Sequence, residues 1–169
     1  MKELHEKDLI YLAGFIDGDG SIFAQIVKKP DYKHKFQIRV TLQLTQLTKR
    51  RWFLDKIQNL IGAGIVRKRG QISDYVLVEP ANVAALLKQL KPFLIIKQKQ
   101  ANLVLRIIEQ LPSTKDSLDK FLELCDFVDQ VASLNDSKKR TNTAQTVKAT
   151  LKRSDNGIVP VETSDDSFL

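Results

Sequence analysis

The chain has 169 residues, a formal net charge of +7, and hydrophobic and charged fractions of 43% and 28%. These values are those of one globular domain with a real core, and they exclude a mostly disordered chain. No run approaches the roughly 18 apolar residues of a membrane span, and the acidic start MKELHEKD is unlike a signal peptide. We therefore expect an intracellular protein without a membrane partner, in which the lone Cys125 is a small buried residue.

The charge is unevenly distributed along the sequence. Every Lys and Arg lies within residues 1–153, whereas residues 154–169 hold four acids and no base. This contrast predicts one domain over residues 1–153, followed by a disordered acidic tail over residues 154–169. From Gln25 to Val76 there are twelve Lys or Arg and three Asp, a density that favours a polyanion partner over a merely soluble basic surface.

A helix and two strands are predicted in the first 45 residues. Apolar side chains in residues 8–18 recur at the spacing of an amphipathic helix that starts near Asp8. Residues 21–28 are rich in β-formers, and a loop with Pro30 separates them from a segment in which apolar and polar residues alternate. The apolar set of that segment is Phe36, Ile38, Val40, Leu42 and Leu44. The polar set is Lys35, Gln37, Arg39, Thr41, Gln43 and Thr45. This polar set contains no acid, which suits phosphates and base edges better than solubility alone requires.

The remaining elements are predicted from caps, turns and prolines. Thr48 is expected to cap a helix that Gly62 ends, and Gly70 to form the turn between two short strands. Pro80 suits the first turn of a helix that ends near Leu90. Three further helices are expected over about residues 96–111, 117–134 and 141–153. The predicted fold is α+β, with the order αββαββ followed by helices: a four-stranded, mainly antiparallel sheet with helices on one side and a ligand on the other.

The segment LAGFIDGDG, residues 12–20, combines two unusual features. Gly14 and Gly18 lie four apart on one helix face, where small residues let two backbones approach, either between chains or inside one chain. Asp17 and Asp19 fall at the C-terminal end of the helix, where exposed carbonyls already make the field negative. A cation would relieve this conflict, and oxygen ligands suit Mg²⁺ or Ca²⁺ rather than Zn²⁺. Two Asp in a glycine-rich turn are also ordinary turn chemistry.

These nine residues resemble the signature of the LAGLIDADG homing endonucleases. Three further segments, QLTQLTKRRWFLDKI, RKRG and PFLIIKQKQANLVLRIIEQLP, are similar to the single-motif chloroplast intron enzymes, as is the αββαββ order. The similarity spans nearly all of residues 7–150. Only one copy of the motif is present, whereas a two-motif monomer would need about twice this length.

The resemblance implies a DNA endonuclease that works as a homodimer. In this family the motif helices of two subunits pack side by side and bring one acidic residue from each chain together under the DNA minor groove. Here that residue is Asp19, with Gly18 offering its carbonyl to the metal. Ala13, Gly14 and Asp17 are the implied dimer-interface residues, and Asp17 is also expected to be structural. The implied reaction hydrolyses both strands of a long pseudo-palindromic target, leaves short 3′ overhangs and promotes intron homing.

The resemblance also implies the other catalytic groups and the cofactor. Gln46, Arg50 and Lys97 fall at family positions that order the attacking water or stabilise charge on the scissile phosphate. Each of the three is otherwise an ordinary surface residue of a basic protein. Mg²⁺ is the implied cofactor, with Mn²⁺ as a substitute and Ca²⁺ as an ion that binds without supporting cleavage. The implied compartment is the chloroplast, and no small-molecule substrate is expected.

Target reading is expected from sheet side chains in the major groove, because Arg can bond guanine bidentately and Gln can do the same with adenine. The candidates are Gln25, Lys28, Tyr32, Gln37, Arg39, Thr41, Gln43, Arg67, Arg69, Asp74 and Val76. Contacts to phosphate, which add affinity without sequence preference, are expected from Lys138, Lys139, Arg140, Lys148 and Lys152. His5 and His34 are predicted to be uninvolved surface residues, with backbone phosphate as the alternative contact for His34.

Three other functions compete with the endonuclease. An intron RNA maturase or a non-catalytic DNA-binding protein of the same fold would share the basic sheet. Retention of Asp19, Gln46, Arg50 and Lys97 together favours cleavage over both. A basic interaction module that never contacts nucleic acid leaves the acidic pair and the polar strand face unexplained.

Overall fold

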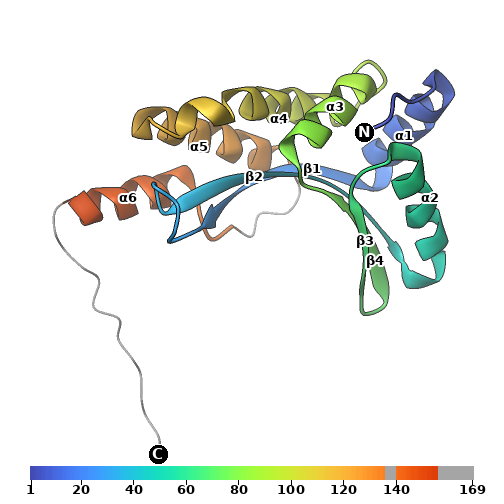
Figure 1. The fold of residues 1–169 in the computed structure, drawn as a ribbon, viewed down its shortest axis with the longest axis horizontal. Coiled ribbons are helices and arrows are strands. Elements are labelled where there is room, and N and C mark those ends of the chain that lie inside the picture. The colour runs from blue at the N-terminus through green and yellow to red at the C-terminus, as the bar shows by residue number, and fades with distance from the viewer. Residues whose placement is uncertain (136–139, 156–169) are drawn as a thin grey trace, which may run out of the picture.

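The computed structural model describes residues 1–135 and 140–155 (Figure 1). Its elements in chain order are α1 (Glu6–Asp19), β1 (Gly20–Lys28), β2 (Phe36–Leu47), η1 (Thr48–Arg50), α2 (Arg51–Ile61), β3 (Ile65–Arg69), β4 (Ile72–Leu77), α3 (Pro80–Leu90), α4 (Gln98–Gln110), η2 (Leu111–Thr114), α5 (Leu118–Ser133) and α6 (Ala144–Asp155). The αββαββ order followed by helices is confirmed. No helix within the described ranges has both the length and the apolar content that a membrane crossing requires.

The four strands form one sheet in the order β1-β2-β4-β3, and every neighbouring pair is antiparallel. The two hairpins join through β2 and β4, where Thr45 pairs with Asp74. Arg67 of β3 pairs with Asp74 from the other side. The register therefore places side chains from three strands next to one another on the same face of the sheet.

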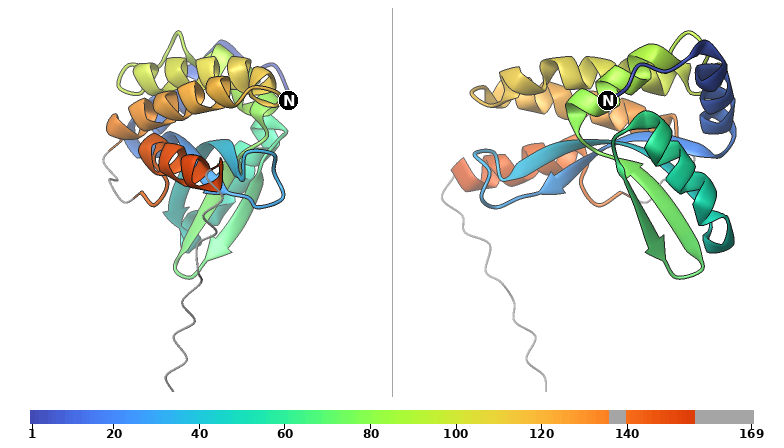
Figure 2. Two further views of the ribbon diagram at one scale, coloured as in Figure 1. Left: turned by 90° about the vertical axis from the view of Figure 1, so that its left-hand side faces the viewer. Right: turned by 45° about the vertical axis from the view of Figure 1, so that its right-hand side comes forward.

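Helices cover one face of this sheet and leave the other open. In Figures 1 and 2, α3, α4 and α5 lie over the same side of β1 and β2, and the opposite side of the curved sheet carries no such layer. The covered face carries most of the buried apolar residues of the strands, and these include all five apolar residues predicted for β2: Phe36, Ile38, Val40, Leu42 and Leu44. The α+β class and the one-sided helical layer expected from the sequence are thus confirmed.

Three predicted element boundaries are wrong for identifiable reasons. Thr48 begins the short 3-10 turn η1 and does not cap α2, because its hydroxyl bonds to the Gly70 carbonyl at 3.3 Å and to Ser73. The last helix, α6, starts at Ala144 and not near residue 141, because the Thr143 hydroxyl accepts a bond from the Thr146 amide at 3.2 Å. Helix α4 starts at Gln98, two residues later than predicted, next to the backbone amides that bond to Asp17 of α1.

Other turns form as their residue types predict. Gly62 ends α2 with φ +73° and Gly70 turns the β3–β4 hairpin with φ +64°, both in the left-handed region that favours glycine. Helix α6 continues to Asp155, and the rest of the predicted tail, residues 156–169, lies outside the described residues. The division into a domain and a tail stays a prediction.

Candidate active site and nucleic-acid interface

Asp17 ties the end of α1 to the segment between α3 and α4. Its carboxylate accepts bonds from the backbone N–H groups of Ile95 at 2.7 Å and Lys97 at 2.9 Å, and the Lys97 ammonium donates to the Asp17 carbonyl at 2.6 Å. Burial acts to raise the pKa of Asp17, but these backbone donors and the Lys97 charge outweigh it, so the pKa lies below its ordinary value. Lys97 is the N-cap of α4, so both amides that bond to Asp17 lie just before the first helical residue, Gln98.

Asp19 is the last residue of α1 and its side chain is exposed. The Gln46 side-chain amide donates to the Asp19 carboxylate at 3.4 Å, and the Arg50 guanidinium donates to the Gln46 side-chain carbonyl at 3.3 Å. Gly20 follows Asp19 directly, and a Cβ there would lie 2.7 Å from the Ile16 backbone, so only glycine fits this close turn into β1. The structure thus brings the expected catalytic residues Asp19, Gln46 and Arg50 into one hydrogen-bonded chain.

A hollow of about 760 Å³ opens beside Asp19, between the sheet and the ends of α4 and α5. Its polar lining includes Asp19, Gln25, Gln43, Lys97, Gln100 and Asn135. The buried Gln100 donates to the Leu134 carbonyl at 3.1 Å, and Asn135 donates to the Ile22 carbonyl of β1 at 3.2 Å. These bonds hold the end of α5 against α4 and against β1 at the edge of the hollow.

The oxygen atoms at the end of α1 suit a hard divalent cation. The Asp19 carboxylate and the Gly18 carbonyl are oxygen donors of the kind that Mg²⁺ and Ca²⁺ prefer. Within residues 1–135 and 140–155, no three His, Cys, Asp or Glu side chains gather into a group able to hold a metal. One chain thus offers two neighbouring oxygen donors at this end of α1.

Gly14 and Gly18 are exposed, and a Cβ added at either would meet no atom within 4 Å. Packing inside the chain therefore does not require glycine at these positions, although glycine within a helix costs about 1 kcal/mol relative to Ala. The alternative that the small residues serve tight packing within one chain is wrong. Ala13 differs from them: it is fully buried in the core and has no surface to offer, which corrects its assignment to the dimer interface.

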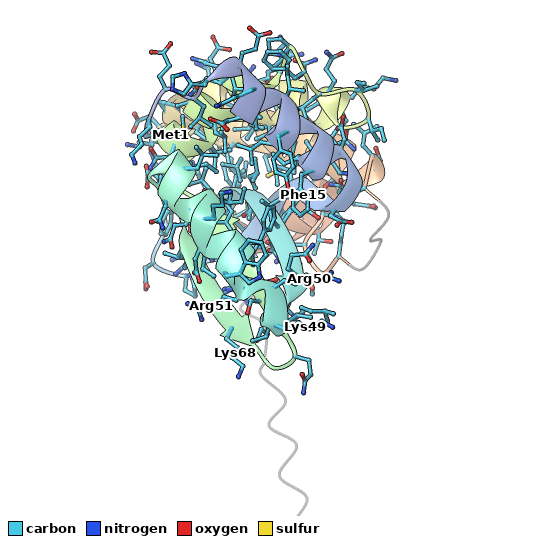
Figure 3. The ribbon with its side chains drawn as sticks, turned by 90° about the vertical axis from the view of Figure 1, so that its right-hand side faces the viewer. Met1, Phe15, Lys49, Arg50, Arg51 and Lys68 are labelled. Carbon is cyan, nitrogen blue, oxygen red and sulfur yellow. The ribbon has the colours of Figure 1, made fainter. Side chains whose placement is uncertain are left out.

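Large apolar side chains flank the two glycines. On α2, Phe53 packs edge-on against Tyr11 and Phe15 of α1, with ring centroids 6.3 and 4.9 Å apart, and Figure 3 shows Phe15 where these two helices face each other. Trp52 is 66% exposed on the same helix as Phe53, and Ile95, beside Asp17, is 86% exposed. Apolar surface of this extent around a smooth helix face is typical of a protein–protein contact.

Side chains of all four strands alternate onto the open face. The sequence candidates that lie there are Gln25, Gln37, Arg39, Thr41, Gln43, Arg67, Arg69, Asp74 and Val76. Lys28 is different, because it shares the alternation of the buried Ile22, Ala24 and Ile26 and pairs with Phe36. The structure therefore corrects the assignment of Lys28 to the residues that read DNA: at this end of β1, Val27 and not Lys28 lies on the open face.

Asp74 organises the centre of the open face. Its carboxylate is fully buried and accepts bonds from Arg69 at 2.9 Å, Thr45 at 2.7 Å and Gln43 at 3.1 Å, with Arg67 at 3.8 Å. Burial acts to raise the pKa of Asp74, but the bonds from Arg69 and Thr45 and the two Arg charges outweigh it, so the pKa lies below its ordinary value of 3.8. One acid thus fixes the directions of two arginines and a glutamine.

We expect Asp74→Asn to lower the free energy of unfolding at pH 7 by about 1–3 kcal/mol, because it removes charged hydrogen bonds from a buried site. The pKa of Asp74 is lowered in the folded state, so its contribution is present above the unfolded value of 3.8 and is lost as the pH falls through the folded pKa. Urea titrations of both proteins between about pH 7 and pH 2 test this. A gap between the two proteins that stays constant as the pH falls would contradict the ionic role.

The remaining residues expected to contact DNA differ in whether their side chains are already bonded within the chain. Tyr32 is exposed in the loop between β1 and β2. Arg140 is bonded to Asp129, whose other oxygen accepts from the first amide of α6, and Lys148 is bonded to Asp126 at 2.9 Å. Lys152 is exposed, and Lys138 and Lys139 lie outside the described residues.

Sequence reasoning missed several residues of the open face. Ser21, Phe23, Val27 and Ile65 share the open face by register. The period-two alternation of residues 20–28 was the signal that would have placed the first three. His34 was also misjudged: it is half-buried, and its ring contacts two elements of the helical layer.

Comparison with known proteins agrees with this geometry. The LAGLIDADG endonuclease family model matches residues 12–109. DNA endonuclease I-CreI of Chlamydomonas reinhardtii is 62% identical over 143 residues, covering 85% of this chain and 88% of that protein. DNA endonuclease I-CvuI of Chlorella vulgaris is 44% identical over 144 residues, covering 85% and 89%. The chain belongs to the LAGLIDADG endonuclease family, which confirms the resemblance and the enzyme class expected from its motif.

Solved structures of related proteins have the same fold. The homing endonuclease I-CvuI, in complex with the I-CreI target in the presence of 2 mM Mg and with the DNA not cleaved, superposes with a TM-score of 0.85 at 41% identity, covering 92% of this chain and 98% of that one. An archaeal intron-encoded homing endonuclease, I-Vdi141I, complexed with DNA, gives a TM-score of 0.80 at 19% identity over 90% and 99%. The second likeness concerns the fold alone.

Proposed function

We propose that the protein is a homing endonuclease that binds a long, pseudo-palindromic DNA duplex as a homodimer and hydrolyses both strands across the minor groove. The observation that carries this proposal is the hydrogen-bonded chain from Asp19 through Gln46 to Arg50, at the end of a helix whose glycines are left open to a partner. Structures of I-CvuI bound to DNA support it, in one case with its own target and 2 mM Ca. An organelle intron, in the chloroplast, is the proposed genetic setting, because the relatives come from Chlamydomonas reinhardtii and Chlorella vulgaris.

Two copies of the chain supply the residues of the active sites. Asp19 of each copy, with the Gly18 carbonyl, would hold divalent cations, for which we propose Mg²⁺. When bound, such cations activate water and stabilise charge on the scissile phosphate and the leaving 3′ oxygen. Gln46 restrains the Asp19 carboxylate and is itself held by Arg50, so the three keep their places before DNA arrives. Lys97 is held by the Asp17 carbonyl and places a positive charge on the wall of the hollow beside Asp19.

Recognition and cleavage take place at different parts of the protein. Arg67 and Arg69, aligned by Asp74, present guanidinium donors to base edges in the major groove. The amide NH2 of Gln43 is held by Thr45 and Asp74, so Gln43 presents its side-chain carbonyl as an acceptor. The basic side chains at the rim of the open face add affinity by contacting DNA phosphates. Cleavage at the end of α1 on each copy, offset across the minor groove, would leave short 3′ overhangs and promote intron homing.

The test is incubation of the protein and Mg²⁺ with a randomised duplex library, followed by sequencing of the cut ends. We expect a single family of long, near-palindromic sites with cuts on both strands. Binding of duplex DNA without cutting would identify a DNA-binding protein of the same fold. Preference for folded intron RNA over every duplex would identify a maturase.

Arg69→Ala is expected to relax discrimination at one base pair in each half-site by about 1–3 kcal/mol, because Arg69 presents a donor pair to a base edge. Cleavage of a panel of single-base-pair target variants measures this. Lys68→Ala is the matched control, since Lys68 is exposed on the neighbouring strand position and its side chain faces the other side of the sheet. Equal weakening on all targets would instead make Arg69 a phosphate contact.

A further inference from the structure

The loop between β1 and β2, residues 29–35, is a compact unit held by its own bonds. The Lys29 amide donates to the Lys35 carbonyl at 2.8 Å, the Lys35 amide donates to the Tyr32 carbonyl at 2.8 Å, and the Lys35 ammonium donates to the Pro30 carbonyl at 3.0 Å. Lys35 has φ +57°, which closes the turn into β2. These bonds fix the shape of the loop, whose two ends are attached to the sheet at the Lys28–Phe36 pair.

His34 connects this loop to the helical layer. Its Nε2 lies 3.0 Å from the Thr114 carbonyl in η2, and its ring stacks on Phe121 of α5 with centroids 5.1 Å apart and an interplanar angle of 27°. A carbonyl oxygen can only accept, so the imidazole must carry its proton on Nε2. The face of the imidazole ring thus stacks on Phe121, and its Nε2–H edge bonds to the Thr114 carbonyl.

The partners of His34 are firmly placed. Phe121 is 3% exposed and belongs to the hydrophobic core, and Thr114 is buried, with its hydroxyl bonded to the Leu111 carbonyl at 2.7 Å. Because Phe121 and Thr114 are packed against the core, their positions are fixed. The contacts of the His34 ring with them therefore restrain the position of the loop.

The loop lies far from the chemistry. Strand β1 begins directly after Asp19 and reaches the loop nine residues later, a span of about 26 Å in extended chain. Figure 1 shows the loop at the end of the β1–β2 hairpin away from α1. A side chain that acts through this loop therefore changes contacts at the outer part of each half-site and leaves the catalytic chain untouched.

We propose that His34 is a positioning residue for target recognition: by fastening the β1–β2 loop to η2 and α5, it sets where Tyr32 and its loop neighbours meet the outer base pairs of each half-site. The inference rests on the proposed function and adds a residue to its reading surface. His34 does not touch the DNA in this role. It acts through the loop that it holds.

The experiment compares His34→Ala, which removes both contacts, with His34→Phe, which keeps an aromatic ring on Phe121 but drops the bond to Thr114. His5→Ala is the matched control, because His5 is exposed and its side chain makes no capping bond at the start of α1. Cleavage of all single-base-pair variants of the target gives a discrimination profile for each protein. Hydrogen–deuterium exchange of the DNA-free proteins reports separately on residues 29–35.

We expect His34→Ala to reduce discrimination by about three- to tenfold at the outermost base pairs only, with unchanged cleavage rate at saturating DNA and faster exchange in residues 29–35. His34→Phe should show a smaller change, and His5→Ala none. An unaltered profile for His34→Ala, or an equal loss at every position together with a lower melting temperature, would overturn the positioning role. If the wild type had no DNA target at all, the proposed function would fail first, and that outcome differs from a wild type with a target that His34→Ala reads equally well.

Discussion

Asp19→Asn should abolish double-strand cleavage while leaving affinity for the DNA target within about tenfold of wild type. The substitution keeps the shape of the side chain and its bond to Gln46 but removes the charge that a divalent cation requires. Asp19 is at the end of α1, and the reading side chains are on the sheet, so the loss concerns the chemical step and not recognition.

Two measurements separate these effects. Cleavage of the preferred target in Mg²⁺ reports the chemistry, and binding in Ca²⁺ reports affinity without turnover. Glu109→Gln is the matched control, because it also removes one negative charge from an exposed position, on α4. Robust Mg²⁺-dependent cutting by Asp19→Asn would remove Asp19 from the mechanism.

Gly14→Leu should convert the dimer into a folded monomer that no longer cuts both strands. Two active sites are needed across the minor groove, and one chain supplies one Asp19, so the second must come from another copy. A leucine at Gly14 would project from α1 into the space where we propose that the partner helix packs. Within the chain the added Cβ would meet no atom within 4 Å, and leucine has a higher helix propensity than glycine, so the subunit itself should still fold.

Sedimentation should show wild-type protein at about twice 19.2 kDa and Gly14→Leu at the mass of one chain, with matching circular dichroism spectra. Asn102→Leu serves as control, since it adds the same side chain to an exposed position of α4. A wild-type monomer that remains monomeric on DNA and still cuts both strands would refute the shared site.

The sequence by itself determined the elements and the chemistry of the motif. Alternation along β2, the glycines at 62 and 70 and the proline at 80 each act on neighbouring residues, so their local patterns predicted strand, turn and helix correctly. The motif LAGFIDGDG identified the family, because its residues match a known signature. It also led to Asp19, Gln46 and Arg50, which the structure brings together.

Only the tertiary structure decided which distant residues meet. The pairing of β2 with β4 sets Asp74 beside Thr45, and Asp17 bonds to Ile95 and Lys97, some 80 positions along the chain. Such contacts depend on how whole elements pack, and no local period encodes them. The spacing of Leu9, Leu12, Ala13 and Ile16 already placed Ala13 on the apolar face of α1, but only packing shows that the neighbouring Gly14 has open space around it and that Ala13 has no surface left for a partner.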